Sequence, residues 1–180
     1  MKNEIFKIVS EQSKIEWIGK KVTGAHDGTI DVKDGEIILN NGKVVGGTVV
    51  VNTASIKILD ILDPATNTQM LTHLASDDFF SIEEFPEAVL DIISVNGDRV
   101  EADLTIKGIK HRIGFEISVN ASSTLLTASA RVIVDRTKYE MKFRSGNFFQ
   151  NLGDTLIYND FELNVTLTAK SVKENVSVTI

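Results

Sequence analysis

A strict two-residue alternation of apolar and polar side chains is the feature that most limits how this chain can fold. The segments that carry it are residues 100–107, 112–119 and 161–169. Because successive side chains of a β-strand point to opposite faces, each segment predicts a strand with one apolar and one polar face. Such strands are typical of antiparallel sheets with one buried side, since the strands of parallel sheets are apolar on both faces.

Further extended segments raise the expected number of strands to roughly eight or nine. They are residues 15–22, 28–33, 36–40, 44–52, 88–95, 125–135 and 138–143, the last with Tyr139, Met141 and Phe143 on one side. The pairs that predict tight hairpin turns are Asp34-Gly35, Asn41-Gly42 and Asn96-Gly97, and Gly46-Gly47 predicts a bulge or bend within a strand. Short strands at close spacing predict an all-β sandwich or barrel. No repeat or linker divides the sequence, so we expect a single domain over residues 1–180.

Residues 63–78 depart from the strand pattern and predict one short helix. Asp63 is a residue type that caps helix N-termini, and Pro64 suits the first helical position, where its missing N–H costs nothing. Met70 and Leu74 are four residues apart and would share one face of this helix.

Composition argues against several classes of partner. The net charge is −6 and the basic residues are scattered, whereas nucleic acids and anionic membranes both attract concentrated basic surfaces. We therefore expect no nucleic-acid partner. The chain contains no cysteine, so it offers no disulfide and no thiolate for catalysis or metal binding.

No stretch approaches the ~18 apolar residues of a membrane-spanning helix, so we expect no integral membrane segment. At the N-terminus, Glu4 and Lys7 interrupt the apolar residues that a signal peptide would need. As written, the sequence predicts a cytoplasmic protein, and a periplasmic one would follow if a leader had been removed.

Patterns typical of catalysis or metal binding are absent from the sequence. His26, His73 and His111 lie far apart without His-x-His or His-x-x-x-His spacing, which favours surface or hydrogen-bonded histidines over metal ligands. Of Asp77 and Asp78, at the unfavourable end of the helix dipole, one is expected to be held by a hydrogen bond. No Gly-x-Ser-x-Gly elbow and no phosphate-binding loop occurs. We expect no enzymatic activity, no catalytic residue, no metal and no cofactor.

Four segments, in order along the chain, resemble the YceI-like family of polyisoprenoid-binding, lipocalin-like barrels. They are residues 50–58, ending in Ala54-Ser55-Ile56; residues 74–86, with Asp78-Phe79-Phe80 and Phe85-Pro86; residues 104–111, with Leu104-Thr105-Ile106-Lys107-Gly108; and residues 134–139, with Arg136. The second and third segments are fairly specific in combination. Together with the closing strand over 161–169, the resemblance covers residues 5 to 170.

The resemblance implies an antiparallel barrel of about eight strands, capped by a helix and holding a long isoprenoid or similar lipid. Each buried CH₂ of such a ligand contributes ~0.8 kcal/mol to binding. Candidate ligand contacts, with core packing as the alternative for each, are Trp17, Phe79, Phe80, Phe85, Leu104, Ile106, Phe115, Ile117, Tyr139, Met141, Phe143, Phe161 and Leu163. Arg136 is expected to pair with a nearby carboxylate or with the ligand's head group.

The leading hypothesis is therefore non-catalytic binding or transport of a long-chain apolar lipid, isoprenoid or fatty-acyl, inside a barrel. Two alternatives stay open: a lipid-modifying enzyme with a polar cluster near the barrel mouth, and a protein-interaction or stress-response module whose barrel is filled. A homodimer also stays open, since a lid helix could serve as a dimer surface.

Overall fold

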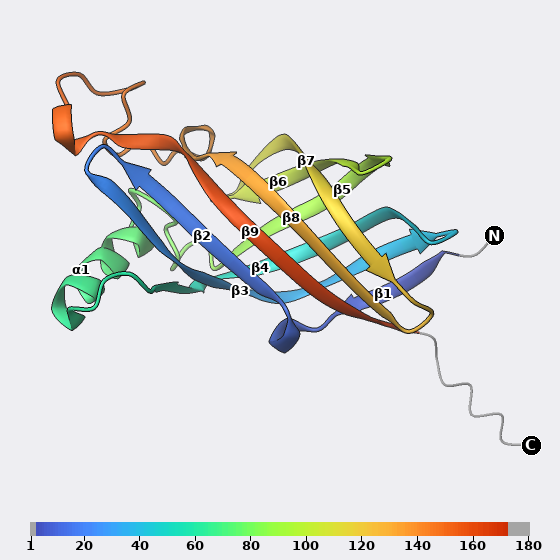
Figure 1. The fold of residues 1–180 in the computed structure, drawn as a ribbon. Helices are drawn as coiled ribbons and strands as arrows, with labels where there is room; N and C mark the ends of the chain where they lie inside the picture. The colour runs from blue at the N-terminus through green and yellow to red at the C-terminus, as the bar shows by residue number, and fades with distance from the viewer. Residues whose placement is uncertain (1–2, 173–180) are drawn as a thin grey trace, which may run out of the picture.

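The computed structural model describes residues 3–172, which form a β-barrel with an α-helix at one end (Figure 1). The strands are β1 (Glu4–Ile8), β2 (Lys14–Lys21), β3 (Gly24–Asn40), β4 (Lys43–Ile58), β5 (Glu87–Asn96), β6 (Arg99–Ile106), β7 (Ile109–Ala121), β8 (Leu125–Asp135) and β9 (Ile157–Ser171). The helix is α1 (Pro64–Ala75), and short 3-10 helices lie at Ser10–Gln12 (η1), Arg136–Tyr139 (η2) and Gly153–Thr155 (η3). Residues 1–2 and 173–180 of the expected domain lie outside the described residues.

All strand pairs are antiparallel, and the ring β3–β2–β9–β8–β7–β6–β5–β4 closes where β4 pairs with β3. The expected antiparallel barrel is thus confirmed. The alternation pattern did not predict β1. This short strand lies between β3 and β9, as β2 does, but it pairs with the opposite ends of those two strands. Phe6 and Ile8 of β1 are buried in the core.

The predicted hairpin turn at Asp34-Gly35 was wrong, because both residues lie inside β3. The β3–β4 ladder shifts its register between Val32 and Asp34. A Cβ on Gly35 would lie 2.3 Å from the carbonyl oxygen of Thr48. Glycine at position 35 therefore allows two backbones to approach closely at a bulge, and the segments 28–33 and 36–40 form one long strand.

The other two predicted turns and the predicted bulge are confirmed. Asn41-Gly42 joins β3 to β4, Asn96-Gly97 lies at the β5–β6 connection, and the left-handed φ angles are 52° at Asn41, 74° at Gly42 and 62° at Gly97. The β3–β4 register shifts again next to Gly46, where Ile38 pairs with Gly46 and Leu39 pairs with Val44, so that Val45 is the extra residue of a bulge.

The strand predicted over residues 138–143 was also wrong. β8 ends at Asp135, whose side chain accepts a hydrogen bond from the backbone N–H of Thr137 at 3.0 Å and so begins η2. Glu140 then adopts a left-handed conformation with φ of 60°. Tyr139 and Met141 nevertheless both point into the core. The alternation of apolar residues in this segment therefore arises because the two side chains are buried on either side of the turn at Glu140.

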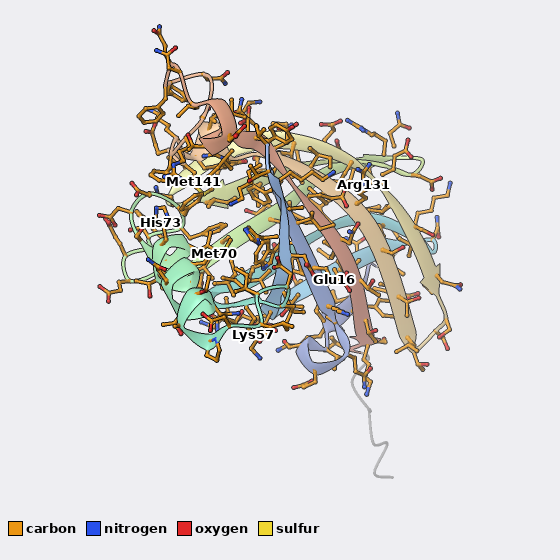
Figure 2. The ribbon with its side chains drawn as sticks, turned by 60° about the vertical axis from the view of Figure 1, so that its left-hand side comes forward. Glu16, Lys57, Met70, His73, Arg131 and Met141 are labelled. Carbon is orange, nitrogen blue, oxygen red and sulfur yellow. The ribbon has the colours of Figure 1, made fainter. Side chains whose placement is uncertain are left out.

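The predicted helix is confirmed, and it lies across one end of the barrel (Figure 1). Asp63 caps α1 by accepting a hydrogen bond from the backbone N–H of Thr66 at 2.9 Å. No residue of α1 is fully buried, and Met70 and Leu74 pack partly buried against the barrel core. Figure 2 shows Met70 on the side of α1 that faces the barrel. Within residues 3–172, no helix is both long enough and apolar enough to cross a bilayer.

The barrel interior contains two groups of buried apolar side chains. One lies mainly on β1 to β4, and the other lies on β5 to β8 and the η2 segment. Between them is a seam of residues that pack against both groups without being fully buried: Val51, Leu74, Phe80, Leu90, Ile92, Val95, Ile117, Leu163 and Val165.

Candidate functional site

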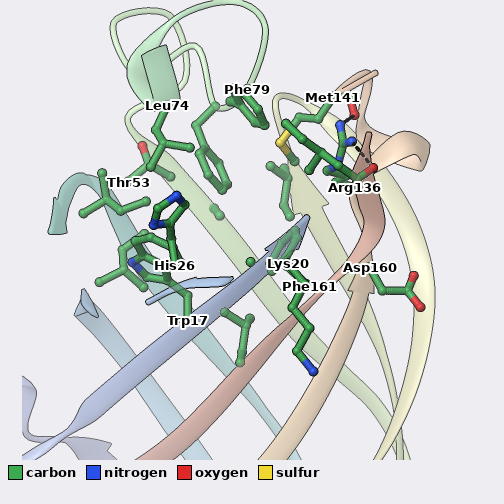
Figure 3. Close-up of a pocket in the computed structure, with 18 of the residues that line it drawn as sticks. Trp17, Lys20, His26, Thr53, Leu74, Phe79, Arg136, Met141, Asp160 and Phe161 are labelled. Carbon is green, nitrogen blue, oxygen red and sulfur yellow. Dashed lines mark hydrogen bonds between the residues drawn. The ribbon is translucent and has the colours of Figure 1, made fainter. Parts of the chain in front are cut away.

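A cavity of about 180 Å³ opens into the barrel at the end that carries α1 (Figure 3). Its walls come from β2, β3, β4, β5, β6 and β9, from α1 and from the segments that follow α1 and β8. The surface is almost wholly apolar, and the apolar residues that line it are Ile15, Trp17, Ile30, Val51, Ile56, Met70, Leu74, Phe79, Phe80, Ala88, Leu104, Ile106, Met141, Ile157, Phe161 and Leu163. Val51, Leu74, Phe80 and Leu163 also belong to the seam, so the cavity adjoins it.

The structure brings most of the candidate ligand contacts together around this cavity. Those that line it are Trp17, Phe79, Phe80, Leu104, Ile106, Met141, Phe161 and Leu163, together with Arg136. Those that lie outside the lining are Phe85, Phe115, Ile117, Tyr139 and Phe143.

The candidates outside the lining pack into the protein instead. Phe115 and Tyr139 are buried in the core of the β5–β8 wall, and Ile117 lies in the seam. Phe143 makes an edge contact with the ring of His73, with 4.5 Å between ring centres. The ring of Phe85 lies beside Gly108, where a Cβ would be 3.2 Å from it.

Trp17 forms one wall of the cavity and is fixed by two backbone acceptors. Its indole N–H is shared between the carbonyl oxygens of Thr29 and Lys57, each at 3.2 Å. Trp17 also lies directly opposite Gly28 in the β2–β3 ladder. The missing side chain at Gly28 leaves room for the indole to lie flat against β3.

The chain after α1 turns sharply and places two phenylalanines in the cavity. The backbone N–H of Phe79 donates to the carbonyl of Ser76 at 3.0 Å, and that of Phe80 donates to the carbonyl of Leu74 at 3.0 Å. The Phe80 ring meets Phe161 of β9 edge to face, with 6.4 Å between centres. The end of α1 is thereby tied to the opposite wall of the barrel.

Arg136 is buried at the cavity wall, and backbone carbonyls take the place of the expected carboxylate partner. Its Nη1 donates to Met141 at 2.6 Å, while Nε and Nη2 donate to Tyr158 and Ile157, each at 3.0 Å. The β8–β9 ladder ends at Asp135, so the guanidinium satisfies the carbonyls that β8 no longer reaches. Burial lowers the pKa of Arg136, and the neighbouring Asp135 carboxylate opposes that effect.

The polar lining residues gather at the mouth, where the β2–β9 ladder is interrupted. Gly19 pairs with Phe161 and Lys21 pairs with Ile157, so the single residue between them on β2 faces three residues of β9. Lys20, Lys21, His26, Tyr158 and Asp160 line this part of the cavity. Three of these side chains, Lys20, Tyr158 and Asp160, are exposed to solvent. The sheet is therefore open beside the cavity, and polar side chains gather at this opening, while Arg136 and Thr53 are buried polar residues of the lining.

The histidines are hydrogen-bonded, as the sequence predicted. His26 bonds to Asp60 at 2.7 Å, His73 to Asp78 at 3.0 Å, and His111 to the carbonyl oxygen of Lys138 at 2.9 Å. Both adjacent carboxylates after α1 are held, since Asp77 accepts a hydrogen bond from Ser81 at 2.7 Å. Within residues 3–172, no three His, Asp or Glu side chains converge on one metal position.

The sequence did not predict the residues of the mouth or those that α1 contributes to the cavity wall. Nothing in the sequence around Lys20, Tyr158 and Asp160 indicates an opening, because the opening depends on how two distant strands pair. For Met70 and Leu74 the sequence did hold an indication, since their helical spacing already placed them on a common face.

Comparison with known sequences identifies the family. A family model described as YceI-like domain matches residues 6–169. Two relatives from Staphylococcus aureus align over shorter stretches. UPF0312 protein SAB2563 (strain bovine RF122 / ET3-1) is 33% identical over 78 residues, which cover 39% of this chain and 46% of the relative. UPF0312 protein SA2479 (strain N315) is 41% identical over 51 residues, or 28% of this chain and 30% of the relative. The chain thus spans less than half the length of these relatives.

Solved structures share the fold at low sequence identity. BcnA of Burkholderia cenocepacia has a TM-score of 0.64 and 18% identity over 90% of this chain and 99% of its own. A polyisoprenoid binding domain from Saccharophagus degradans, implicated in plant cell wall breakdown, has a TM-score of 0.68 and 13% identity over 92% and 98%. The Campylobacter jejuni YCEI protein has a TM-score of 0.54 and 15% identity over 84% and 83%. These likenesses establish the barrel fold, and the family match over residues 6–169 shows that the chain belongs to the YceI-like domain family.

Proposed function

We propose that this protein binds the apolar chain of a lipid, isoprenoid or fatty-acyl, inside its barrel without chemically altering it. The observation that carries the proposal is the apolar cavity at the α1 end, which opens beside the interrupted β2–β9 ladder. An apolar chain in such a cavity gains ~0.8 kcal/mol for each CH₂ removed from water. Affinity would then come from burial in a preformed site with few polar contacts.

The isoprenoid class has additional support from the structural neighbours. A domain with the same fold, from Saccharophagus degradans, is described as polyisoprenoid binding. The methyl branches of an isoprenoid chain suit a slot lined by aromatic rings and branched aliphatic side chains, such as Trp17, Phe161 and Leu163.

The size of the cavity defines how a long chain would be accommodated. Its volume of about 180 Å³ is below the ~300–1,000 Å³ typical of sites for drug-sized ligands. A long chain would therefore enter at the mouth and extend along the seam between the two buried groups. Side chains there, including Leu90, Ile92 and Val165, are only partly buried and would turn aside to admit it.

The polar end of the ligand would remain at the mouth. Lys20 and His26 line this part of the cavity and could contact a phosphate, carboxylate or hydroxyl group. Arg136 lies deeper, and one N–H from each of three nitrogens already binds a backbone carbonyl. Its two remaining N–H groups are the candidates for the head-group contact inferred from the sequence.

The test combines mass spectrometry with a variant that fills the cavity. Protein purified without detergent is extracted with organic solvent, and we expect a stoichiometric long-chain lipid. Ala88→Leu adds a side chain at the cavity wall and should remove most of the bound lipid. Val89→Leu, on the opposite face of β5, is the matched control and should retain it. No lipid in the wild type, and no rise in melting temperature with added prenyl alcohols or fatty acids, would rule the proposal out.

A further inference from the structure

Several large apolar side chains project into solvent around the mouth of the cavity. Leu62, in the loop before α1, is 90% exposed. Phe148 and Phe149, between η2 and η3, are 50% and 48% exposed, and Leu59 and Val22 are also exposed. We call these five residues the apolar rim. Isolated exposed apolar residues need no explanation, but two adjacent phenylalanines and a fully projecting leucine around one opening do.

Hydrogen bonds tie the segments of the rim to the strands that form the mouth. The backbone N–H of Val22 donates to Leu156 at 3.2 Å, and that of Leu59 donates to Asp27 at 2.9 Å. The segment with the two phenylalanines is joined to the start of β9, where Ile157 donates to the carbonyl of Arg144 at 2.9 Å. Figure 1 shows that the β2–β3 hairpin, the loop before α1 and the segment before β9 all lie at the end of the barrel that carries α1.

The charges near the rim nearly cancel. The basic residues are Lys20, Lys21, Lys142 and Arg144, and the acidic residues are Asp60, Asp63, Glu140, Asp154 and Asp160. The ammonium of Lys142 lies 4.8 Å from the centre of the Phe148 ring and 3.0 Å from the carboxylate of Glu140, so its charge is already balanced beside the apolar ring. Attraction to an anionic surface is therefore a weak contribution here, and burial of the apolar side chains is the main one.

We propose that the apolar rim docks this protein onto the surface of a lipid bilayer, so that the cavity exchanges its ligand directly with the membrane. The proposal rests on the proposed function, because a ligand with a long apolar chain is stored in bilayers. The rim also consists of separate loop tips around an opening. A bilayer interface accepts apolar side chains that protrude at separate points, whereas a protein partner needs a continuous complementary surface.

The experiment is flotation of the full chain with vesicles of pure phosphatidylcholine, and with vesicles that also contain phosphatidylglycerol. We expect similar binding to both, unchanged by high salt. Replacing both phenylalanines, in Phe148→Ser/Phe149→Ser, should weaken vesicle binding by about tenfold for each ring removed. Ile93→Ser is the matched control: Ile93 is 48% exposed, like Phe149, but lies near the β5–β6 turn at the far end of β5 from Ala88.

Several outcomes would overturn the docking surface. One is that the protein does not float with vesicles. Another is that its flotation requires phosphatidylglycerol or is lost in high salt. A third is that Ile93→Ser weakens vesicle binding as much as Phe148→Ser/Phe149→Ser does. A dimer in light scattering that dissociates in Phe148→Ser/Phe149→Ser would assign the rim to a second copy of this chain instead. Binding of farnesol without vesicles separates the two proposals. Farnesol binding without flotation overturns docking alone, and flotation without ligand binding overturns the proposed function while the docking surface stands.

Discussion

The indole of Trp17 lies against the backbone of Gly28, so that a Cβ at position 28 would approach Cζ2 of the indole to 2.6 Å. The same Cβ would lie 1.7 Å from the carbonyl oxygen of Lys57, which also accepts the indole N–H. Three strands, β2, β3 and β4, therefore meet at this point with no space for a side chain. The contact fixes the cavity wall that Trp17 forms.

We accordingly expect Gly28→Ala to lower the free energy of unfolding by about 1–3 kcal/mol, the usual cost of overpacking a close backbone contact. Gly46→Ala is the matched control from the same β3–β4 ladder. Its Cβ would meet only the Cδ1 atom of Ile38 at 3.7 Å, an ordinary contact. Urea denaturation measures both variants, and equal stability of the two would show that the Trp17 contact does not constrain position 28.

Arg136 is expected to be more important for stability than an exposed arginine. Arg136→Met removes the donors for three carbonyls, and leaving such buried acceptors unpaired should cost about 3–5 kcal/mol. Arg131→Met is the control, since Arg131 is an exposed residue paired with Glu162 and such a surface pair contributes about 0–1 kcal/mol. Chemical denaturation distinguishes the two, and a similar small loss for both would contradict the bridging role of Arg136 between η2 and β9.

Tyr139 should be a site where a substitution stabilises the protein. Its hydroxyl is buried and has no hydrogen-bond partner among the described residues. Replacing it in Tyr139→Phe removes that unpaired group while the ring keeps its edge contact with His111, at 5.3 Å between centres. We expect a gain of about 1 kcal/mol at neutral pH. A loss of stability on thermal or chemical denaturation would show that the hydroxyl is satisfied, for instance by a buried water.

The same residue should make the protein sensitive to alkali. Burial, with a smaller contribution from the Asp135 carboxylate, raises the pKa of Tyr139 from 10.0 to about 12. Above pH 10 the unfolded chain loses this proton first, so the free energy of unfolding should fall between about pH 10 and 12. Tyr139→Phe should lose that part of the pH dependence, whereas Tyr158→Phe, at an exposed tyrosine, should keep it. Identical alkaline profiles for wild type and Tyr139→Phe would refute the assignment.

The strands with strict alternation were predictable because, along the whole length of each strand, one face packs into the apolar interior of the barrel. That pattern gives β6, β7 and β9, the break in it over residues 63–78 gives the helix, and the resemblance to a known family adds closure of the barrel. Alternation cannot separate core from cavity, since Phe115 and Leu163 both point inward and only the second lines the cavity. The partners of Arg136 were not predictable either, because backbone carbonyls at a strand end leave no trace in the side-chain sequence.

Helix α1 is expected to act as a lid over the cavity. No residue of α1 is fully buried, so the helix should open at lower free energy than the strand ladders. We expect its amides to exchange with solvent faster than those of β8, and added farnesol to slow exchange in α1 while leaving β8 unchanged. Uniform protection of α1 and β8, or no effect of the ligand on α1, would rule out a lid.

The capping residue provides a variant for the same measurement. Hydrogen bonds from the side chain and backbone of Thr66 lower the pKa of Asp63 below its usual value of 3.8. The cap should therefore be intact above pH 3.8 and weaken as the pH falls through the lower value found in the folded protein. Asp63→Ala should speed α1 exchange about fivefold at neutral pH, whereas Asp63→Asn, which keeps an acceptor oxygen, should remain close to wild type. If Asp63→Ala left α1 exchange unchanged while ligand still protected the helix, the lid would depend on the contacts of Met70 and Leu74 with the barrel and not on its cap.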